Sequence, residues 1–341
     1  MPFATPHSGQ KGSPVTELAL AAFAAETGSH IVNAPRSARY AAFARRFDEA
    51  HYLGALRERG LRWLARSDPT FPPLLGAIHD PPPGLFLRGT GPVDLLQQPT
   101  VAVVGARACS GYGAQVARAC GRELSAGGLV VVSGLARGID GEAHRGAVEV
   151  SGSTVAVLGC GIDRDYPASH RELARQIGAG GLIVSEYAPG VEPAPWRFPA
   201  RNRIIAGLAA ATVVVEAREA SGALITADLA LEEGREVFAV PGEITSALAA
   251  GTNALLRLGA TPLTRPDDVL ESFGLAAPPT HAPEIGANAD VILTRLRDTA
   301  ASADELTRTT GLAPSVLAGA LAELELLGLA VEEGGVYRAG H

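Results

Sequence analysis

Seven arginines lie in or beside short glycine-rich turns in the central part of this 341-residue chain. A guanidinium is planar and permanently charged, which suits it to phosphate. A glycine-rich turn that begins a helix adds free backbone N–H groups and the positive end of the helix dipole. Several such groups on one surface favour a ligand with repeated phosphates over a ligand with one. The arginines are Arg107, Arg137, Arg164, Arg197, Arg201, Arg203 and Arg218.

Two aromatic residues, Trp196 and Phe198, lie on either side of Arg197. Aromatic rings stack on unpaired bases, and one stacked base contributes roughly 1–3 kcal/mol. The arginines and rings together therefore predict a contact with a single nucleic-acid strand. The alternative is that the arginines are held within the loops by the carboxylates of Asp163, Asp165, Glu186 and Glu216.

The sequence lacks the motifs of the common nucleotide enzymes and metal sites. A Walker A loop needs the lysine of GxxxxGK[ST], and Lys11 is the only lysine. Gly159-Cys-Gly161 has no third glycine at the offset of a dinucleotide fingerprint. Three cysteines without a CxxC pair, and eight histidines without HxxxH or HExxH spacing, indicate no zinc site. We therefore expect no cofactor, no metal and no catalytic residue.

One group of polar residues allows a catalytic interpretation. Asp140 and His144 lie one helical turn apart with Ser133 upstream, as a hydrolytic triad would require. No GxSxG turn accompanies them. The favoured interpretation is that Asp140 is a helix N-cap and that His144 is its local partner.

Six short apolar runs, rich in β-branched residues, are expected to position these loops. The runs do not alternate with polar residues, which is typical of strands buried on both faces. Helical patterns between them predict right-handed βαβ units and an α/β fold with a doubly wound parallel sheet. The loops then emerge at the carboxyl ends of the strands, where such sheets bind ligands. The runs are 101–104, 129–132, 154–158, 182–184, 212–215 and 237–240.

The N-terminal part of the chain has a different composition. Residues 1–14 are rich in proline, glycine and serine and are expected to be disordered. Residues 15–88 indicate a small helical domain, which ends in a segment that its prolines keep extended. The arginine excess in residues 36–66 belongs either to solvated helix faces or to an accessory nucleic-acid contact.

The sheet domain is expected to cover residues 91–274, followed by a linker at 275–289 and a winged helix at 290–341. The winged helix is predicted from three helical patterns, one with a Ser302/Glu305 capping box, and a final hairpin. Its third helix contains glutamates but no arginine or lysine, so it is poorly suited to a phosphate-lined groove. A protein contact or a packing role is the favoured interpretation.

The overall composition is that of a globular protein, with 47% hydrophobic residues and a net charge of −7. This charge argues against a protein that coats DNA through bulk positive charge. The sequence shows neither a secretory leader nor an apolar run of membrane length. A cytoplasmic protein without membrane contact is therefore expected.

Several of these segments together resemble the DprA/Smf family of bacterial DNA-processing proteins. The resemblance is strong over residues 71–266, and the order of the flanking domains agrees with it. The segments are Val-Gly-Ala-Arg107, Tyr112-Gly113, Ser133–Asp140 with Ala143-His144, Ala156–Asp163 with Tyr166-Pro167, Ser185–Tyr187, Phe198–Gly207, Val215–Ala217, Ser221-Gly222 with Thr226-Ala227, and Val240–Gly242.

The resemblance implies an extended Rossmann-like sheet between an N-terminal SAM-like helical domain and a C-terminal winged helix. It implies a homodimer, formed through the later part of the Rossmann-like domain, that binds and protects incoming single-stranded DNA. The dimer is expected to load the RecA recombinase onto that strand during natural transformation. At one position, Ala106, the family usually has serine, so a hydroxyl donor near the phosphate site is missing. The residues expected at the DNA site are Gly105, Arg107, Ser133, Gly134, Arg137, Arg197, Phe198, Arg201, Asn202, Arg203 and Ser221.

An enzyme is the competing hypothesis. The turn Ser221–Thr226 is faintly similar to the phosphate turn of lysine-decarboxylase-like nucleotide hydrolases, with Glu216 as the possible acid. Glu216 could equally hold a neighbouring arginine, Arg201 or Arg203, in place.

Overall fold

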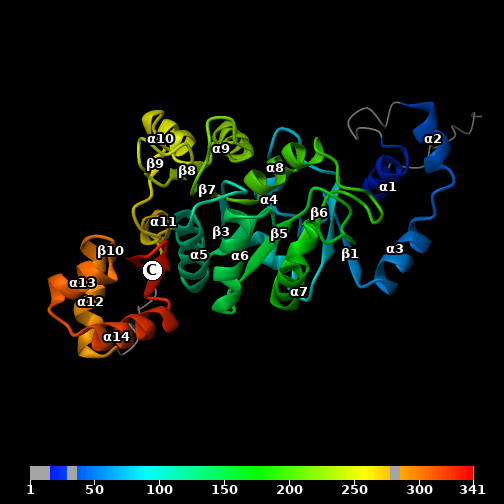
Figure 1. Cartoon of the computed structure of the whole chain (residues 1–341). Helices are drawn as coiled ribbons and strands as arrows, with labels where there is room; N and C mark the ends of the chain where they lie inside the picture. The colour runs from blue at the N-terminus through cyan, green and yellow to red at the C-terminus, as the bar shows by residue number, and fades with distance from the viewer. Residues whose placement is uncertain (1–15, 29–36, 277–284, 341) are drawn as a thin grey trace, which may run out of the picture.

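The computed structural model describes residues 16–28, 37–276 and 285–340. Within these ranges, a nine-stranded sheet has the order β1-β2-β6-β5-β4-β3-β7-β8-β9 (Figure 1). The six predicted strands are present as β3 to β8, and every pairing among them is parallel, which confirms the predicted α/β fold. The strands are β1 (Leu61–Ala65), β2 (Gly84–Arg88), β3 (Thr100–Val104), β4 (Val130–Ser133), β5 (Thr154–Val157), β6 (Leu182–Ser185), β7 (Ala211–Val214), β8 (Glu236–Ala239) and β9 (Thr261–Pro262).

The segment before residue 88 differs from the expectation in two ways. Strands β1 and β2 pair antiparallel with each other, and β2 pairs antiparallel with β6, so both extend the sheet. Residues 61–88 therefore belong to the sheet rather than to a separate helical domain. The prolines also do not exclude a helix, because Pro73 begins the short helix α4 (Pro73–Gly76) at the first position, where its missing N–H has no cost.

Helices cover both faces of the sheet, and alternate strand residues point to opposite layers. On one face, Val104 and Val132 pack with residues of α4, α8 and α9. On the other, Val103 and Val131 pack with residues of α5 and α6. The helices are α5 (Gly111–Ala126), α6 (Ile139–Glu149), α7 (Arg171–Gly180), α8 (Arg197–Leu208), α9 (Gly222–Glu232), α10 (Ala250–Arg257) and α11 (Asp267–Ser272), with short 3₁₀ turns at Val93–Gln97 and Ala168–His170.

The N-terminal helices and the winged helix lie at opposite ends of the sheet (Figure 1). The N-terminal helices are α1 (Glu17–Thr27), α2 (Ala38–Ala44) and α3 (Glu49–Glu58). An aromatic cluster of Phe23, Tyr40 and Phe43 joins α1 to α2. The SAM-like character of this region stays a prediction, and predicted disorder at 1–14 lies outside the described residues.

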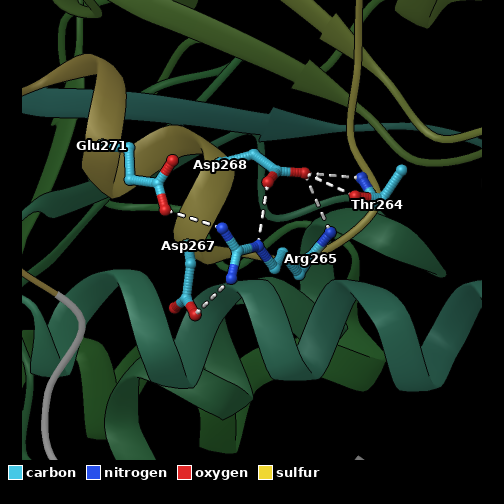
Figure 2. A network of polar contacts seen from close by, with 5 residues as sticks. All are labelled: Thr264, Arg265, Asp267, Asp268 and Glu271. Atoms are coloured by element: carbon cyan, nitrogen blue, oxygen red, sulfur yellow. Dashed lines mark hydrogen bonds and ion pairs between the residues drawn. The ribbon is translucent and has the colours of Figure 1, made fainter.

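The end of the sheet domain is fixed by Arg265, which Figure 2 shows among three carboxylates. The Arg265 guanidinium donates to Asp268 at 3.1 Å and to Glu271 at 2.7 Å. Asp268 also accepts from the backbone N–H of Thr264 at 2.8 Å, which ties the first turn of α11 to the strand before it. This arginine is neutralised locally and is a structural residue.

The C-terminal domain contains the three helices and the hairpin that the sequence predicts. Ser302 and Glu305 form the predicted capping box. Most of the predicted linker at 275–289 lies outside the described residues, and its last three residues already belong to a helix. The elements are α12 (Ala287–Asp298), β10 (Ala301–Ser302), α13 (Ala303–Thr310), α14 (Pro314–Leu326), β11 (Ala330–Glu333) and β12 (Val336–Ala339). Among the described residues, we find no helix long and apolar enough to cross a membrane.

Candidate nucleic-acid interface

A cavity of about 230 Å³ lies at the carboxyl edge of the sheet. It is formed by the loops after β3 and β4 and by the first turns of α8 and α9. Six of the eleven residues predicted for the DNA site line it, and these are Gly105, Arg107, Phe198, Arg201, Asn202 and Ser221. We call this the Arg107 cavity.

Arg107 is the exposed cation of this cavity. Its guanidinium lies over the ring of Phe198, 5.3 Å from the ring centroid. Phe198 also stacks on Tyr166, with 5.2 Å between centroids and 27° between the ring planes. Among the described residues, no carboxylate lies within ion-pair distance of Arg107, so its charge is available to a ligand.

The position of Arg107 follows from the close packing of the loop that carries it. A side chain at Gly105 would lie 2.6 Å from Ile139 Cγ1, so only glycine allows this approach. The Ala106 N–H donates to the Glu216 carbonyl, and the Ala106 carbonyl accepts from Ile139. Ala106 is buried, and these two backbone bonds hold the loop without the serine hydroxyl that the family usually has.

Arg201 has a different role from the predicted one. It is only 4% exposed and donates to the carbonyls of Gly134, at 2.9 Å, and Val157. Burial lowers the pKa of Arg201 to about 10, although the Asp140 carboxylate acts in the opposite direction. Arg201 is therefore a buried structural cation at the base of the cavity.

The predicted free amides of the β4 loop are also already in use. Asp140 accepts from the N–H groups of Gly134, at 3.1 Å, and Ala136, at 3.3 Å. Burial raises the pKa of Asp140, while the Arg201 guanidinium and the two amides oppose that rise. The Asp140 carboxylate therefore occupies the amides that a bound phosphate would use. The unpaired positive charge of the cavity is that of Arg107.

Asn202 and Ser221 are positioned by α8 and α9. The Asn202 amide donates to the Gly222 carbonyl at 3.1 Å, which joins the two helices. Ser221 is the N-cap of α9 and accepts from the Ala223 N–H. The first turn of α9 therefore faces the cavity with its positive dipole end.

The other predicted site residues lie outside the Arg107 cavity. Ser133 is fully buried and donates to the Val103 carbonyl at 2.6 Å, so its hydroxyl cannot reach DNA. Arg203 pairs with Glu186 at 2.7 Å, as the alternative of internal pairing predicted, and also with Asp80 at 3.0 Å. Arg137 is exposed to solvent.

Arg197 lies on the other side of α8. Its guanidinium stacks 4.7 Å from the ring centroid of Trp196 and 5.3 Å from that of Tyr187. Arg203 faces the same side, and both residues line a second cavity that does not include Phe198.

The predicted interpretations of Asp140 and His144 are wrong. Gly138 is the N-cap of α6, because Asp140 lies inside the helix and turns back to the β4 loop. His144 hydrogen-bonds to Thr154 at 2.8 Å rather than to Asp140.

Glu216 holds neither of the two arginines proposed for it. Its carboxylate accepts from the backbone N–H of Ser110 at 2.9 Å and from the Ser110 hydroxyl at 2.5 Å. It thereby supports the start of α5 and does not line the Arg107 cavity. In the described part of the chain, no three His, Cys, Asp or Glu side chains are grouped as metal ligands.

One residue of the site was missed as a ligand group by the sequence analysis. Tyr166 is 42% exposed and lies beside Phe198. The Tyr166-Pro167 pair was part of the resemblance, but nothing in its spacing from Phe198 indicates that the two rings meet.

Comparison with known proteins places this arrangement in a family. The family described as DNA recombination-mediator protein A matches residues 62–274, and the DprA winged helix domain matches residues 276–335. The chain belongs to the DprA/Smf family. The DNA processing protein DprA of Streptococcus pneumoniae is 47% identical over 206 residues, which cover 60% of this chain and 72% of that protein.

Two solved structures of DprA proteins resemble this family member. The S. pneumoniae structure has a TM-score of 0.64 and 39% identity, and the match covers 76% of this chain and 94% of the other. The Helicobacter pylori structure, described by its single-stranded DNA binding mode, has a TM-score of 0.57 and 29% identity. That match covers 62% of this chain and 95% of the other. Membership of the family establishes a role in DNA processing and recombination mediation.

Proposed function

We propose that this chain binds single-stranded DNA in the Arg107 cavity. The observation that carries the proposal is the unpaired Arg107 guanidinium lying over the Phe198 ring in a cavity at the carboxyl edge of the sheet. A cation beside a flat apolar surface matches one nucleotide, with its phosphate on the guanidinium and its base on the ring. In a duplex the base faces are covered by their neighbours, so this contact requires an unpaired strand.

The chemistry of the cavity supports binding without catalysis. A nucleotide hydrolase would need a free acid or base at the cavity, and Glu216 is engaged by Ser110 instead. Asp140 is bound by two amides and faces Arg201, which leaves it poorly placed to transfer a proton. A non-enzymatic binder is therefore the function that these residues support best.

The finer proposal is that the bound strand is protected and passed to RecA during natural transformation, by a homodimer. The later part of the sheet domain exposes several large apolar side chains, which a contact with a second copy of the chain would bury. These side chains are Ile225, Leu231, Ile244 and Leu258. They support a self-contact of that part of the domain.

The proposal is tested by measuring the affinity of the full chain for oligo-dT and for duplex DNA at several salt concentrations. We expect oligo-dT to bind more tightly, with a salt dependence that reports the phosphate contacts. Replacing Arg107 by Ala should weaken binding to any single-stranded sequence, and reduce the log–log salt slope by about 0.7 for one lost phosphate contact.

Arg265→Ala is the matched control, since that guanidinium is held by Asp267, Asp268 and Glu271. Equal salt slopes for the Arg107→Ala variant and the wild type would remove Arg107 from the site. Tighter binding of duplex than of oligo-dT would contradict the proposal as a whole.

A further inference from the structure

A second cavity, of about 160 Å³, lies between helix α1 and helix α8. Its walls include small α1 residues, such as Ala21 and Ala24, and the flat side chains of Tyr187, Trp196 and Arg197. Trp196 is 53% exposed, which is high for the largest apolar side chain. We call this the Trp196 cavity.

The two cavities share helix α8 as a common wall. The N-cap of α8, Trp196, lines the Trp196 cavity together with Ala200 and Arg203 of one helix face. Phe198, Asn202 and Ile205, on the neighbouring face, line the Arg107 cavity. Residues three or four apart share a helix face, so the first turn of α8 forms a ridge with an aromatic ring on each side.

At one end of the Trp196 cavity, two carboxylates neutralise the Arg203 guanidinium. The Glu186 carboxylate receives both terminal nitrogens of Arg203, at 2.7 and 3.2 Å, and Asp80 receives the third guanidinium nitrogen at 3.0 Å. Two carboxylates and one guanidinium leave no positive charge for a phosphate at this end. The Arg203 end of the cavity is therefore suited to an uncharged planar group rather than to an anion.

The flat side chains of the cavity are already arranged as a stack. The Arg197 guanidinium lies over both Trp196 and Tyr187, at 4.7 and 5.3 Å from their centroids. Guanidinium and indole planes are the surfaces on which unpaired bases stack in single-strand-binding proteins. A base that entered beside Trp196 would add to this stack.

From these features we infer that the Trp196 cavity is a second base-binding subsite. It receives the base that neighbours the one on Phe198, as the strand crosses the first turn of α8. This inference rests on the proposed function, because both subsites would hold the same strand. The subsite is indifferent to sequence, since every base has a face that can stack.

The test uses Trp196 as its own reporter. The chain has two tryptophans, and Trp63 packs against Phe86 in the edge strands, 4.6 Å between centroids. In a Trp63→Phe protein, the emission therefore comes from Trp196 alone. We expect saturating oligo-dT to quench this emission, while labelled oligo-dT anisotropy measures affinity independently.

A second variant, Ala24→Phe in the Trp63→Phe background, fills the Trp196 cavity from α1 without changing its charges. We expect the quenching to disappear and the affinity to fall about fivefold to a hundredfold, the loss caused by removing one stacked base. Ala38→Phe is the matched control, since Ala38 is an exposed residue of α2 that lines neither cavity. It should leave both readouts unchanged.

The outcomes separate this inference from the proposed function. If oligo-dT binds with an affinity that depends on Arg107, but Trp196 emission does not change, the second subsite is refuted and the proposed function stands. Quenching that persists in the Ala24→Phe variant also refutes the subsite. If the wild type does not bind oligo-dT, both fail.

Discussion

The arginines of this chain differ in function because their partners and burial differ. Arg107 lies over Phe198 with its charge unpaired, Arg201 is buried against carbonyl groups, and Arg203 is neutralised by two carboxylates. The same residue type thus supplies a ligand contact, a structural cation and an ion pair within one edge of the sheet. A ligand in the Arg107 cavity therefore meets one unpaired guanidinium, that of Arg107.

His144 shows how a buried polar residue can make stability depend on pH. Thr154 Oγ1 donates to the Val131 carbonyl, so it accepts from His144, and the His144 proton lies on Nδ1. Burial, followed by the nearby His170 and the Arg201 and Arg145 charges, lowers the pKa of His144 to about 3. The folded protein therefore holds His144 neutral through the mildly acidic range.

We predict that His144 destabilises the fold as pH falls below about 6.5, the pKa of an unfolded histidine. Below that pH, His144 of the unfolded chain binds a proton that His144 of the folded chain does not bind. The contribution of neutral His144 to the free energy of unfolding is therefore present above about pH 6.5 and is lost as the pH falls towards about 3. Between pH 7.5 and 5.5, the stability gap between wild type and His144→Asn should shrink by about 1.4 kcal/mol. Urea unfolding at the two pH values measures this gap, and a constant gap would show that His144 does not titrate as described.

The strands and helices divide into those that the sequence predicts and those that depend on tertiary contacts. The buried strands β3 to β8 are visible as apolar β-branched runs, and the hairpin of β11 and β12 and the Ser302 capping box are local patterns. Strand β1 carries no such signal because it lies at the edge of the sheet and is half exposed, and β2 directly follows three prolines, which suggest a loop. The pairing of β2 with β6, and of β1 with β2, depends on contacts between segments far apart in the sequence.

The site, too, was predicted only in part, because some of its features depend on tertiary contacts. Sequence order brings Gly105, Arg107 and Phe198 to one sheet edge, because parallel strands present their loops together. It does not show that Asp140 turns back to fill the amides of its own loop, since that depends on a side-chain direction. Sequence order also does not show that Phe198 and Arg203, both on α8, line two different cavities.

The winged helix and the two cavities of the sheet domain are different kinds of surface. The winged helix lies at one end, and its third helix, α14, carries Glu323 and Glu325 but no arginine or lysine. This composition supports the interpretation that α14 contacts protein rather than DNA. The Trp196 cavity is lined in part by α1, whereas all residues that line the Arg107 cavity belong to the sheet domain.

We predict that the proposed homodimer uses the apolar surface of the later sheet domain. Ile244 is 96% exposed and Leu258 is 84% exposed, so replacing either by Arg should not disturb the monomer fold but should separate the protomers. Light scattering of the wild type should give the mass of a dimer and that of each variant the mass of a monomer. Leu326→Arg, at an 88% exposed position of α14, is the matched control. Dissociation by Leu326→Arg alone would place the contact on the winged helix instead.

The most direct test of where the strand binds is photo-cross-linking of the full chain to oligo-dT that carries 5-bromodeoxyuridine, followed by mass spectrometry of the peptides. If the Arg107 cavity holds the strand, the cross-links should lie on the peptides that contain Phe198 or Tyr166, and Arg107→Ala should reduce their yield. Cross-links confined to α14 and its hairpin, or to the arginine-rich segment 36–66, would contradict binding at the sheet edge.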